Sequence, residues 1–207
     1  SSIFLYCQPE DSDVTVFADS TFENEQRISP LQDDSRVHIT RPEGAIAIEP
    51  SSVDLHLQDS FIRLEQQKRA VRVDNEDTYP KQTEHTANEN GYIYIHPNEF
   101  VLATTQEQVQ LDASVVGLLH GRSSVGRLGL FVENAGLVDA GFHGELTLEL
   151  FNASHNTIAL TPGMRIVQLT VHELTTESTE DYAAKSSKYN SQDDVTGSRL
   201  YADRELQ

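Results

Sequence analysis

Apolar residues in the central part of the chain occur in short runs that alternate with polar positions or stop at turn residues. Leu146, Leu148 and Leu150 alternate with Glu, Thr and Glu. A period of two is typical of a half-buried β-strand, so we expect a strand here with Glu149 on the face opposite the leucines. Two further apolar runs, 92–95 and 100–103, flank a His-Pro-Asn-Glu turn and read as neighbouring strands.

The same pattern continues toward the C-terminus and defines the fold class. Runs 157–160 and 165–169 flank a Pro-Gly turn. No long segment keeps a helical period; a short helix is expected only over residues 112–119, with Asp112 as its N-cap. Many short strands with turn residues between them predict an all-β sandwich, jelly roll or closed barrel, with few short helices.

The polar character of the two ends divides the chain into three parts. Residues 1–43 are acidic and hold only short apolar runs, so we expect an N-terminal arm. Residues 44–172 carry the strand pattern and form the β core. Residues 173–207 are rich in Ser, Thr, Asp and Gln, and we expect a tail that orders on contact with something else.

The net charge of the chain limits the classes of partner that we expect it to bind. It has 33 acidic against 15 basic residues among 207, a formal net charge of −18. Nucleic acids and anionic membranes bind clustered positive charge, so neither is expected as a partner. A disordered acidic chain and a folded protein from a salty cytoplasm both fit this charge; a hydrophobic content of 37% favours the folded, salt-adapted protein.

Cysteine and motif content exclude several further classes. Cys7 is the one cysteine, which excludes an intrachain disulfide and a cysteine-based zinc site, the zinc deaminase signature included. No apolar run spans a membrane and no secretory signal is read, so a cytoplasmic location is expected. The sequence has neither a Walker-type phosphate loop nor a dinucleotide fingerprint.

Two segments carry candidate chemistry. In residues 121–127, two arginines bracket two serines and lie beside two glycines. Arginine forks and open backbone N–H groups suit phosphate oxygens, although a turn with solvated arginines fits equally. In residues 135–150, Asp139 precedes a Gly-containing turn and Glu149 lies on a predicted strand. Taken alone, Glu149 reads as an ordinary solvent-facing glutamate.

Taken together, these segments resemble the dCTP deaminase and dUTPase superfamily. The runs are IEPSSVDL (48–55), HGRSSVGRLGL (120–130), AGLVDAGFHGELTLEL (135–150) and PGMRIVQL (162–169), in the family's order, followed by SKYNSQ (187–192) in the tail. The resemblance implies a distorted β-barrel or jelly roll of the dUTPase-like type. It also implies a homotrimer with active sites between subunits, each closed by a tail.

The resemblance assigns the chemistry to a small set of residues. It implies attack of water on C4 of the cytosine of dCTP without a metal, giving dUTP and ammonia. Glu149 takes the place of the family's general base, and Ser123 and Arg127 match the residues that orient the water and the base. The substrate-binding positions carried over are Arg122, Ser124, Ala135, Asp139, Gln168, Tyr182, Lys188 and Gln192. Mg²⁺ is expected on the triphosphate rather than in a protein cage, and dTTP is a candidate feedback inhibitor.

Several alternatives stay open within this resemblance. A glutamate at position 149 and the lack of a Gly-rich closing motif in the tail favour a deaminase over a plain dUTPase. Ala135-Gly136 before Asp139 resembles the bifunctional enzymes that go on to dUMP, and the chain is one residue short between Arg127 and Asp139. A non-catalytic nucleotide-binding trimer on the same fold is a third possibility.

Overall fold

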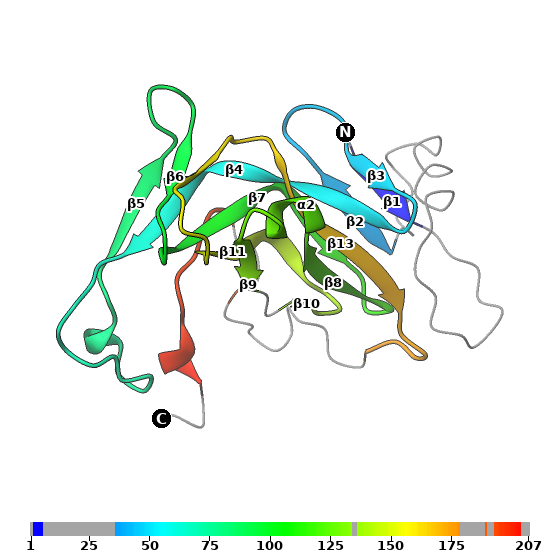
Figure 1. Ribbon diagram of the computed structural model, residues 1–207. Helices are drawn as coiled ribbons and strands as arrows, with labels where there is room; N and C mark the ends of the chain where they lie inside the picture. Colours follow the sequence, from blue (N-terminus) through cyan, green and yellow to red (C-terminus); the bar gives the residue numbers. More distant parts are fainter. Residues whose placement is uncertain (1, 6–35, 134–135, 179–188, 190–192, 204–207) are drawn as a thin grey trace.

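The computed structural model describes residues 2–5, 36–133, 136–178, 189 and 193–203, and strands dominate these parts of the chain (Figure 1). The strands are β1 (Ser2–Leu5), β2 (Val37–Thr40), β3 (Ala47–Glu49), β4 (Ser52–Leu64), β5 (Gln82–Thr86), β6 (Ile93–Ile95), β7 (Phe100–Leu111), β8 (Val115–Gly121), β9 (Leu130–Glu133), β10 (Leu137–Val138), β11 (His143–Asn152), β12 (Ile158–Leu160) and β13 (Arg165–Glu173). The helical pieces are α2 (Ser123–Gly126) and 3-10 turns at Glu76–Thr78 and Leu200–Ala202. This composition confirms the all-β prediction.

One curled sheet of eleven strands forms the body, and all its pairings are antiparallel (Figure 1). The path runs β1-β2-β7-β4-β13-β8-β10, with β11 between β7 and β9. β4 pairs with β13 through Val53 to His56 and with β7 from Leu57 onward, with a register shift before Phe61. A bulge bends a strand, so β4 passes from one layer to the other and joins them into a half-barrel.

Apolar side chains from both layers fill the inside of this half-barrel. Ile39, Leu55, Leu57, Leu148 and Leu150 are each less than 2% exposed. On β11 the burial alternates as the leucine pattern predicts, because neighbouring side chains of a strand point to opposite faces. The strand expected around 146–150 is therefore confirmed, as are those expected around 92–95, 100–103, 157–160 and 165–169.

The helix expected over residues 112–119 is wrong. The carboxylate of Asp112 accepts hydrogen bonds from the backbone N–H of Ser114 (2.7 Å) and from its hydroxyl (2.6 Å). This is a tight turn that leads into β8, whose residues are buried in alternation. An aspartate that caps a helix serves a turn equally well, and the β-branched pair Val115-Val116 favours a strand.

The sheet begins inside the segment that we expected to be an arm. β2 pairs with β7 between Val37 and Thr40, and Val37 and Ile39 are fully buried. Of the two short β-like runs expected in this segment, the one around 3–6 corresponds to β1 over its described residues, and the one around 14–17 lies outside the described residues. At the other end, residues 193–203 of the tail lie against the body beside β11 and the 3-10 turn at Glu76–Thr78 (Figure 1).

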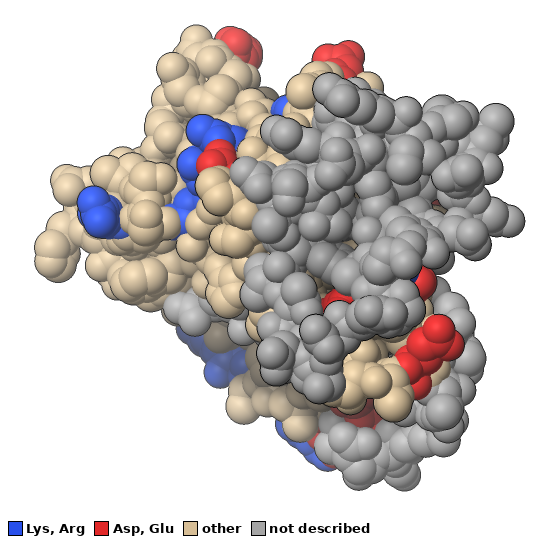
Figure 2. Space-filling view, turned by 90° about the vertical axis from the view of Figure 1, so that its right-hand side faces the viewer, with Lys and Arg blue, Asp and Glu red and all other residues tan. Residues whose placement is uncertain are grey.

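Charged side chains are spread over the described surface. On the side that carries β1, β2 and β3, acidic and basic residues both appear, and the acidic ones stand at several separate places (Figure 2). None of the described helices has the length and apolarity that crossing a membrane requires.

Candidate active site

A cleft of about 720 Å³ opens between β11, β10, the loop after β4 and the described end of the tail. Leu102, Phe142 and Leu146 form part of its apolar wall. Asp139, Thr147 and Glu149 bring polar groups into the same space. The cleft thus combines a mainly apolar lining with a few polar side chains, which is the usual make-up of a small-molecule site.

Glu149 is held on an interior strand. Its backbone pairs with Leu102 of β7 on one side and with Glu133 of β9 on the other. Leu148 and Leu150, its neighbours, are buried in the core, which turns Glu149 toward the cleft. A side chain on a strand that is paired on both sides has a fixed position, as a catalytic group requires.

Asp139 enters the cleft from a turn directly after β10. Its carbonyl accepts a hydrogen bond from the backbone N–H of Phe142 at 3.1 Å, and Gly141 takes the positive φ of 81° that closes the turn. Ala140 and Phe142 are buried and anchor the turn, whereas Asp139 itself is exposed. This carboxylate can therefore accept hydrogen bonds from a ligand in the cleft.

The described end of the tail forms one wall of the cleft. Tyr189, Gly197 and Ser198 line it. The backbone N–H of Thr196 donates to the hydroxyl of Thr147 at 3.4 Å, and the N–H of Arg199 donates to the hydroxyl of Tyr189 at 2.8 Å. The tail therefore meets the strand that carries Glu149.

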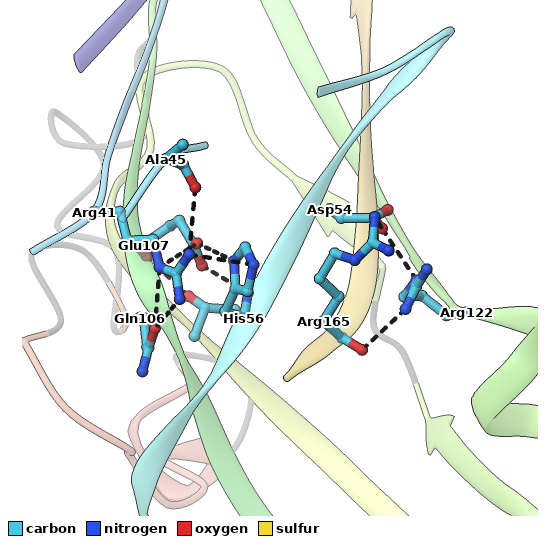
Figure 3. Close-up of polar contacts among 9 residues, drawn as sticks. Arg41, Ala45, Asp54, His56, Gln106, Glu107, Arg122 and Arg165 are labelled. Carbon is cyan, nitrogen blue, oxygen red and sulfur yellow. Dashed lines mark hydrogen bonds and ion pairs between the residues drawn. The ribbon is translucent and has the colours of Figure 1, made fainter. Parts of the chain in front are cut away.

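A second polar group is centred on Asp54 of β4 (Figure 3). Its Oδ2 lies 3.1 Å from Nε of Arg122 and 3.1 Å from Nη1 of Arg165. Its Oδ1 accepts a hydrogen bond from Nε2 of Gln168 at 3.0 Å. Asp54 is fully buried, and a buried carboxylate must be paired to persist. Asp54 thereby fixes two predicted substrate-binding residues, Arg122 and Gln168.

Asp54 and Arg165 hold this polar group together, and neither of them was predicted as a site residue. Val53 and Leu55, which flank Asp54, are fully buried, so the strand is covered on both faces. The sequence gives no local signal for this burial, because apolar Val53 and Leu55 alternate with polar residues, a pattern that favours a solvent-facing aspartate. A buried charge, however, requires a partner. The identity of that partner depends on β8 and β13 lying beside β4, which the local pattern does not contain.

The remaining residues of the 121–127 motif lie on α2, a single turn after β8. The N–H groups of Gly126 and Arg127 donate to the carbonyls of Arg122 and Ser123, each at 3.0 Å, and Val125 is buried beneath the turn. Ser123, Ser124 and Arg127 are exposed on its outside. The turn thus presents two hydroxyls and a guanidinium to whatever approaches it.

The predicted site residues therefore fall into two groups within one chain. Among the described residues, the cleft lining includes Asp139 and Glu149 but none of the α2 group, which comprises Arg122, Ser123, Ser124, Arg127 and Gln168. Ala135, Tyr182, Lys188 and Gln192 lie outside the described residues.

A third polar group lies deeper, between β4 and β7 (Figure 3). Glu107 is fully buried; its carboxylate lies 2.6 Å from Nδ1 of His56 and 3.5 Å from Nε of Arg41. Gln106 accepts from the same guanidinium at 2.8 Å. Within the described parts of the chain, no three His, Cys, Asp or Glu side chains gather as metal ligands.

Comparison with known proteins shows which family the chain resembles. The profile of the dCTP deaminase-like family matches residues 22–174. A protein of Persephonella marina named "dCTP deaminase, dUMP-forming" is 38% identical over 182 residues, 88% of this chain and 98% of that protein. A Haloarcula marismortui protein named "dCTP deaminase" is 41% identical over 165 residues, 78% of this chain and 85% of that protein.

A solved structure shares the fold. The crystal structure of 2′-deoxycytidine 5′-triphosphate deaminase from Agrobacterium tumefaciens superposes with a TM-score of 0.57 at 17% identity. The match covers 78% of this chain and 49% of that one. At this identity the likeness concerns the path of the backbone.

Proposed function

Because the chain belongs to the dCTP deaminase-like family, we propose that it hydrolyses the 4-amino group of dCTP, with Glu149 as the general base. The observation that carries the proposal is the cleft that holds both Glu149 and Asp139. These are the two positions at which the sequence motifs resemble the family's base and sugar contact. The products are dUTP and ammonia, and dUTP is a precursor of dUMP and dTTP.

The proposed chemistry needs one carboxylate and one water. Glu149 accepts a proton from water and passes it to N3 while the hydroxide oxygen bonds to C4 of the cytosine. Glu149 then takes the proton of the new C4 hydroxyl and passes it to the amino group; the C4–N bond breaks, C4=O forms and ammonia leaves. A positioned carboxylate in such a role contributes roughly 10²- to 10⁴-fold to the rate.

Substrate orientation is assigned to the second polar residue of the cleft. Asp139 is exposed at the end of a rigid turn, so its carboxylate can accept a hydrogen bond from the 3′-hydroxyl of the sugar. The apolar wall that includes Leu102 and Phe142 suits the uncharged edges of a nucleoside.

The α2 group completes the site from a neighbouring subunit in this proposal, which requires a homotrimer. Ser123 and Arg127 then orient the water and the base, and Arg122 and Ser124 bind phosphate oxygens. Two observations support an assembly. The α2 group lies apart from the cleft lining within the described chain. Leu128, Phe131 and Leu137 are also 48–64% exposed near α2, β9 and β10, as residues of a subunit contact are in a single chain.

The triphosphate is the most demanding part of the substrate. Because the chain has a net charge of −18, the negative charge of the triphosphate must be balanced locally, by Arg122, Arg127 and Lys188. Mg²⁺ carried on the phosphate oxygens would neutralise part of this charge. Salt screens the remaining repulsion, so affinity for dCTP should rise as salt increases from low values.

The test is the product pattern from dCTP and magnesium at high salt. The chain should release ammonia, and Glu149→Gln should lower that release by about 10²- to 10⁴-fold. The exposed Glu89→Gln is the matched control and should keep full activity. Full ammonia release in Glu149→Gln would remove the glutamate from the mechanism, and nucleotide binding without turnover would indicate a binding protein.

A bifunctional enzyme that forms dUMP is the second candidate. It is favoured by the "dUMP-forming" name of the Persephonella relative and by Gly136 next to the cleft. Pyrophosphate release from dCTP indicates this enzyme, whereas pyrophosphate from dUTP without ammonia from dCTP indicates a dUTPase. In the bifunctional case Asp139→Asn should abolish pyrophosphate release and affect ammonia release less.

A further inference from the structure

Glu145, four residues before Glu149 on β11, is a nearly buried carboxylate. Its residue exposure is 8%, and the ion pairs among the described residues include none from Lys or Arg to Glu145. The hydroxyl of Thr104 on β7 lies 3.5 Å from its Oε2. Neither the cleft lining nor the proposed chemistry uses this residue.

The tail crosses the sheet beside this carboxylate. Asp194 accepts a hydrogen bond from the hydroxyl of Ser60 on β4 at 2.7 Å, and Thr196 donates to Thr147 on β11 at 3.4 Å. β4, β7 and β11 are neighbours in the sheet, so the chain between these two contacts passes over the place where Glu145 lies. The tail is therefore attached on both sides of a buried acid.

The groups that face Glu145 are acidic. Asp194 and Asp193 of the tail and Glu107 of β7 each act on it through their charges. Burial, together with these charges, raises the pKa of Glu145 to about 7. The hydrogen bond from Thr104 opposes this shift only in part.

The basic groups nearby are already engaged elsewhere. His56 of β4 and Arg41 both contact Glu107 rather than Glu145. His143, two positions earlier on β11, interacts with His38 of β2. Among the described residues, the negative charge of Glu145 is therefore balanced by none of these basic groups, which favours its protonated form.

We propose that Glu145 is a positioning residue that lets the tail dock over the cleft when it carries a proton and repels the tail when it is ionised. A protonated Glu145 offers an O–H donor to the acidic tail segment, whereas the ionised form sets a third carboxylate beside Asp193 and Asp194. The link to catalysis rests on the proposed function, because the docked tail closes the cleft that holds Glu149. Tail docking itself can be measured without substrate.

The direction of the pH effect follows from the two states. With the tail docked, burial first and then the charges of Asp194 and Asp193 raise the pKa of Glu145 from its ordinary 4.5 to about 7, so docking favours the protonated form. Docking is then strongest at low pH and weakens as the pH rises through 7. For one proton, the docking constant should fall by up to about tenfold between pH 6 and pH 8.

The experiment uses a fluorescent reporter at the end of the tail. The chain has no tryptophan, and the ring of Tyr201 packs edge-on against Tyr79 with centroids 5.7 Å apart. In the full-length Tyr201→Trp protein, emission should change from the docked to the undocked value as the pH rises from 6 to 8. The absence of any transition in this range would overturn the proposal.

Variants in the reporter background identify the titrating group. Glu145→Gln should stay docked and show a flat profile. Asp194→Asn, which keeps an acceptor for Ser60, should lose less docking between pH 6 and pH 8, because the charge of Asp194 is one of those that raise the pKa of Glu145. Glu89→Gln, on an exposed loop, should titrate like the parent. A Glu145→Gln profile identical to the parent's would overturn the proposal, since a histidine would then be responsible.

A kinetic readout separates this inference from the proposed function. The KM for dCTP should rise between pH 6 and pH 8 in the parent more than in Glu145→Gln, with a smaller change in kcat. Docking that depends on pH in a protein that does not deaminate dCTP would contradict the proposed function alone. Deamination with a docking equilibrium that ignores pH would contradict the role of Glu145 alone.

Discussion

The cleft and the α2 group hold their polar residues in opposite ways. Glu149 lies on a strand paired on both sides, where the backbone of β7 and β9 fixes it. Arg122 is instead fixed through its side chain, by a buried carboxylate, while Ser123 and Arg127 remain on the outside of a one-turn helix. The first arrangement is an enclosed half-site and the second is an exposed one. The proposed homotrimer accounts for this difference, because it brings the two groups together across a subunit boundary.

The largest expected effect comes from separating the two halves in different chains. Glu149→Gln and Arg127→Ala should each lower ammonia release by about 10²-fold or more. Trimers assembled from an equal mixture of both variants should regain about a quarter of the parent activity, because one interface in four then pairs an intact cleft with an intact α2 group. Ammonia assays on co-refolded chains measure this recovery. Mixtures as inactive as the single variants would place both groups in one subunit's site.

An intermediate effect is expected at the carboxylate that fixes Arg122. Asp54→Asn removes the charge between Arg122 and Arg165 inside the sheet, and we expect the free energy of unfolding to fall by about 1–3 kcal/mol. The KM for dCTP should rise more than kcat falls, since Arg122 is assigned to phosphate. Denaturant unfolding and steady-state kinetics provide the two readouts.

Glu49→Gln is the matched control for this carboxylate. Glu49 pairs with the same Arg165 at 2.7 Å, but both side chains are about 40% exposed. An exposed ion pair contributes about 0–1 kcal/mol, so this variant should change stability little. Equal losses in both variants would contradict the special role of burial at Asp54.

The smallest effect is expected where the tail meets β4. Ser60→Ala removes the hydroxyl that donates to Asp194, and the loss of one such hydrogen bond costs about 0.5–1.5 kcal/mol. Tail docking, followed through a tryptophan at position 201, should weaken by roughly twofold to tenfold. Thr157→Ala, whose hydroxyl contacts His96 away from the tail, should leave docking unchanged. No change in Ser60→Ala would mean that this contact does not hold the tail.

The same contrast explains how much could be predicted from the sequence. The strand with Leu146, Leu148 and Leu150 was predictable, because alternation depends on a few neighbouring residues. The helix predicted from Asp112 was wrong for the same local reason, since an aspartate can cap a turn before β8 as readily as a helix. For Asp139 and Glu149 the motifs predicted positions that the structure brings into one cleft, and their roles stay predictions.

The burial of Asp54 and Glu145 could not be predicted from local patterns. Asp54 is covered because β8 and β13 bring Arg122 and Arg165 to it, more than 65 residues away along the chain. Glu145 is covered in part by tail residues about 50 positions later. In both cases the environment of a charge depends on tertiary contacts, which hydrophobic periodicity does not encode.

The residue spacing along β11 fixes the distance between the proposed base and the contact with the tail. Thr147 and Glu149 stand at alternate positions after the register shift that follows Glu145, which places the tail contact and the proposed base about 7 Å apart on one face of the strand. Insertion of one residue would turn these side chains toward the core and the leucines outward. Insertion of two would restore the face but shift the tail contact by a full interval. A change of chain length within this strand is therefore expected to displace the proposed base or the tail contact.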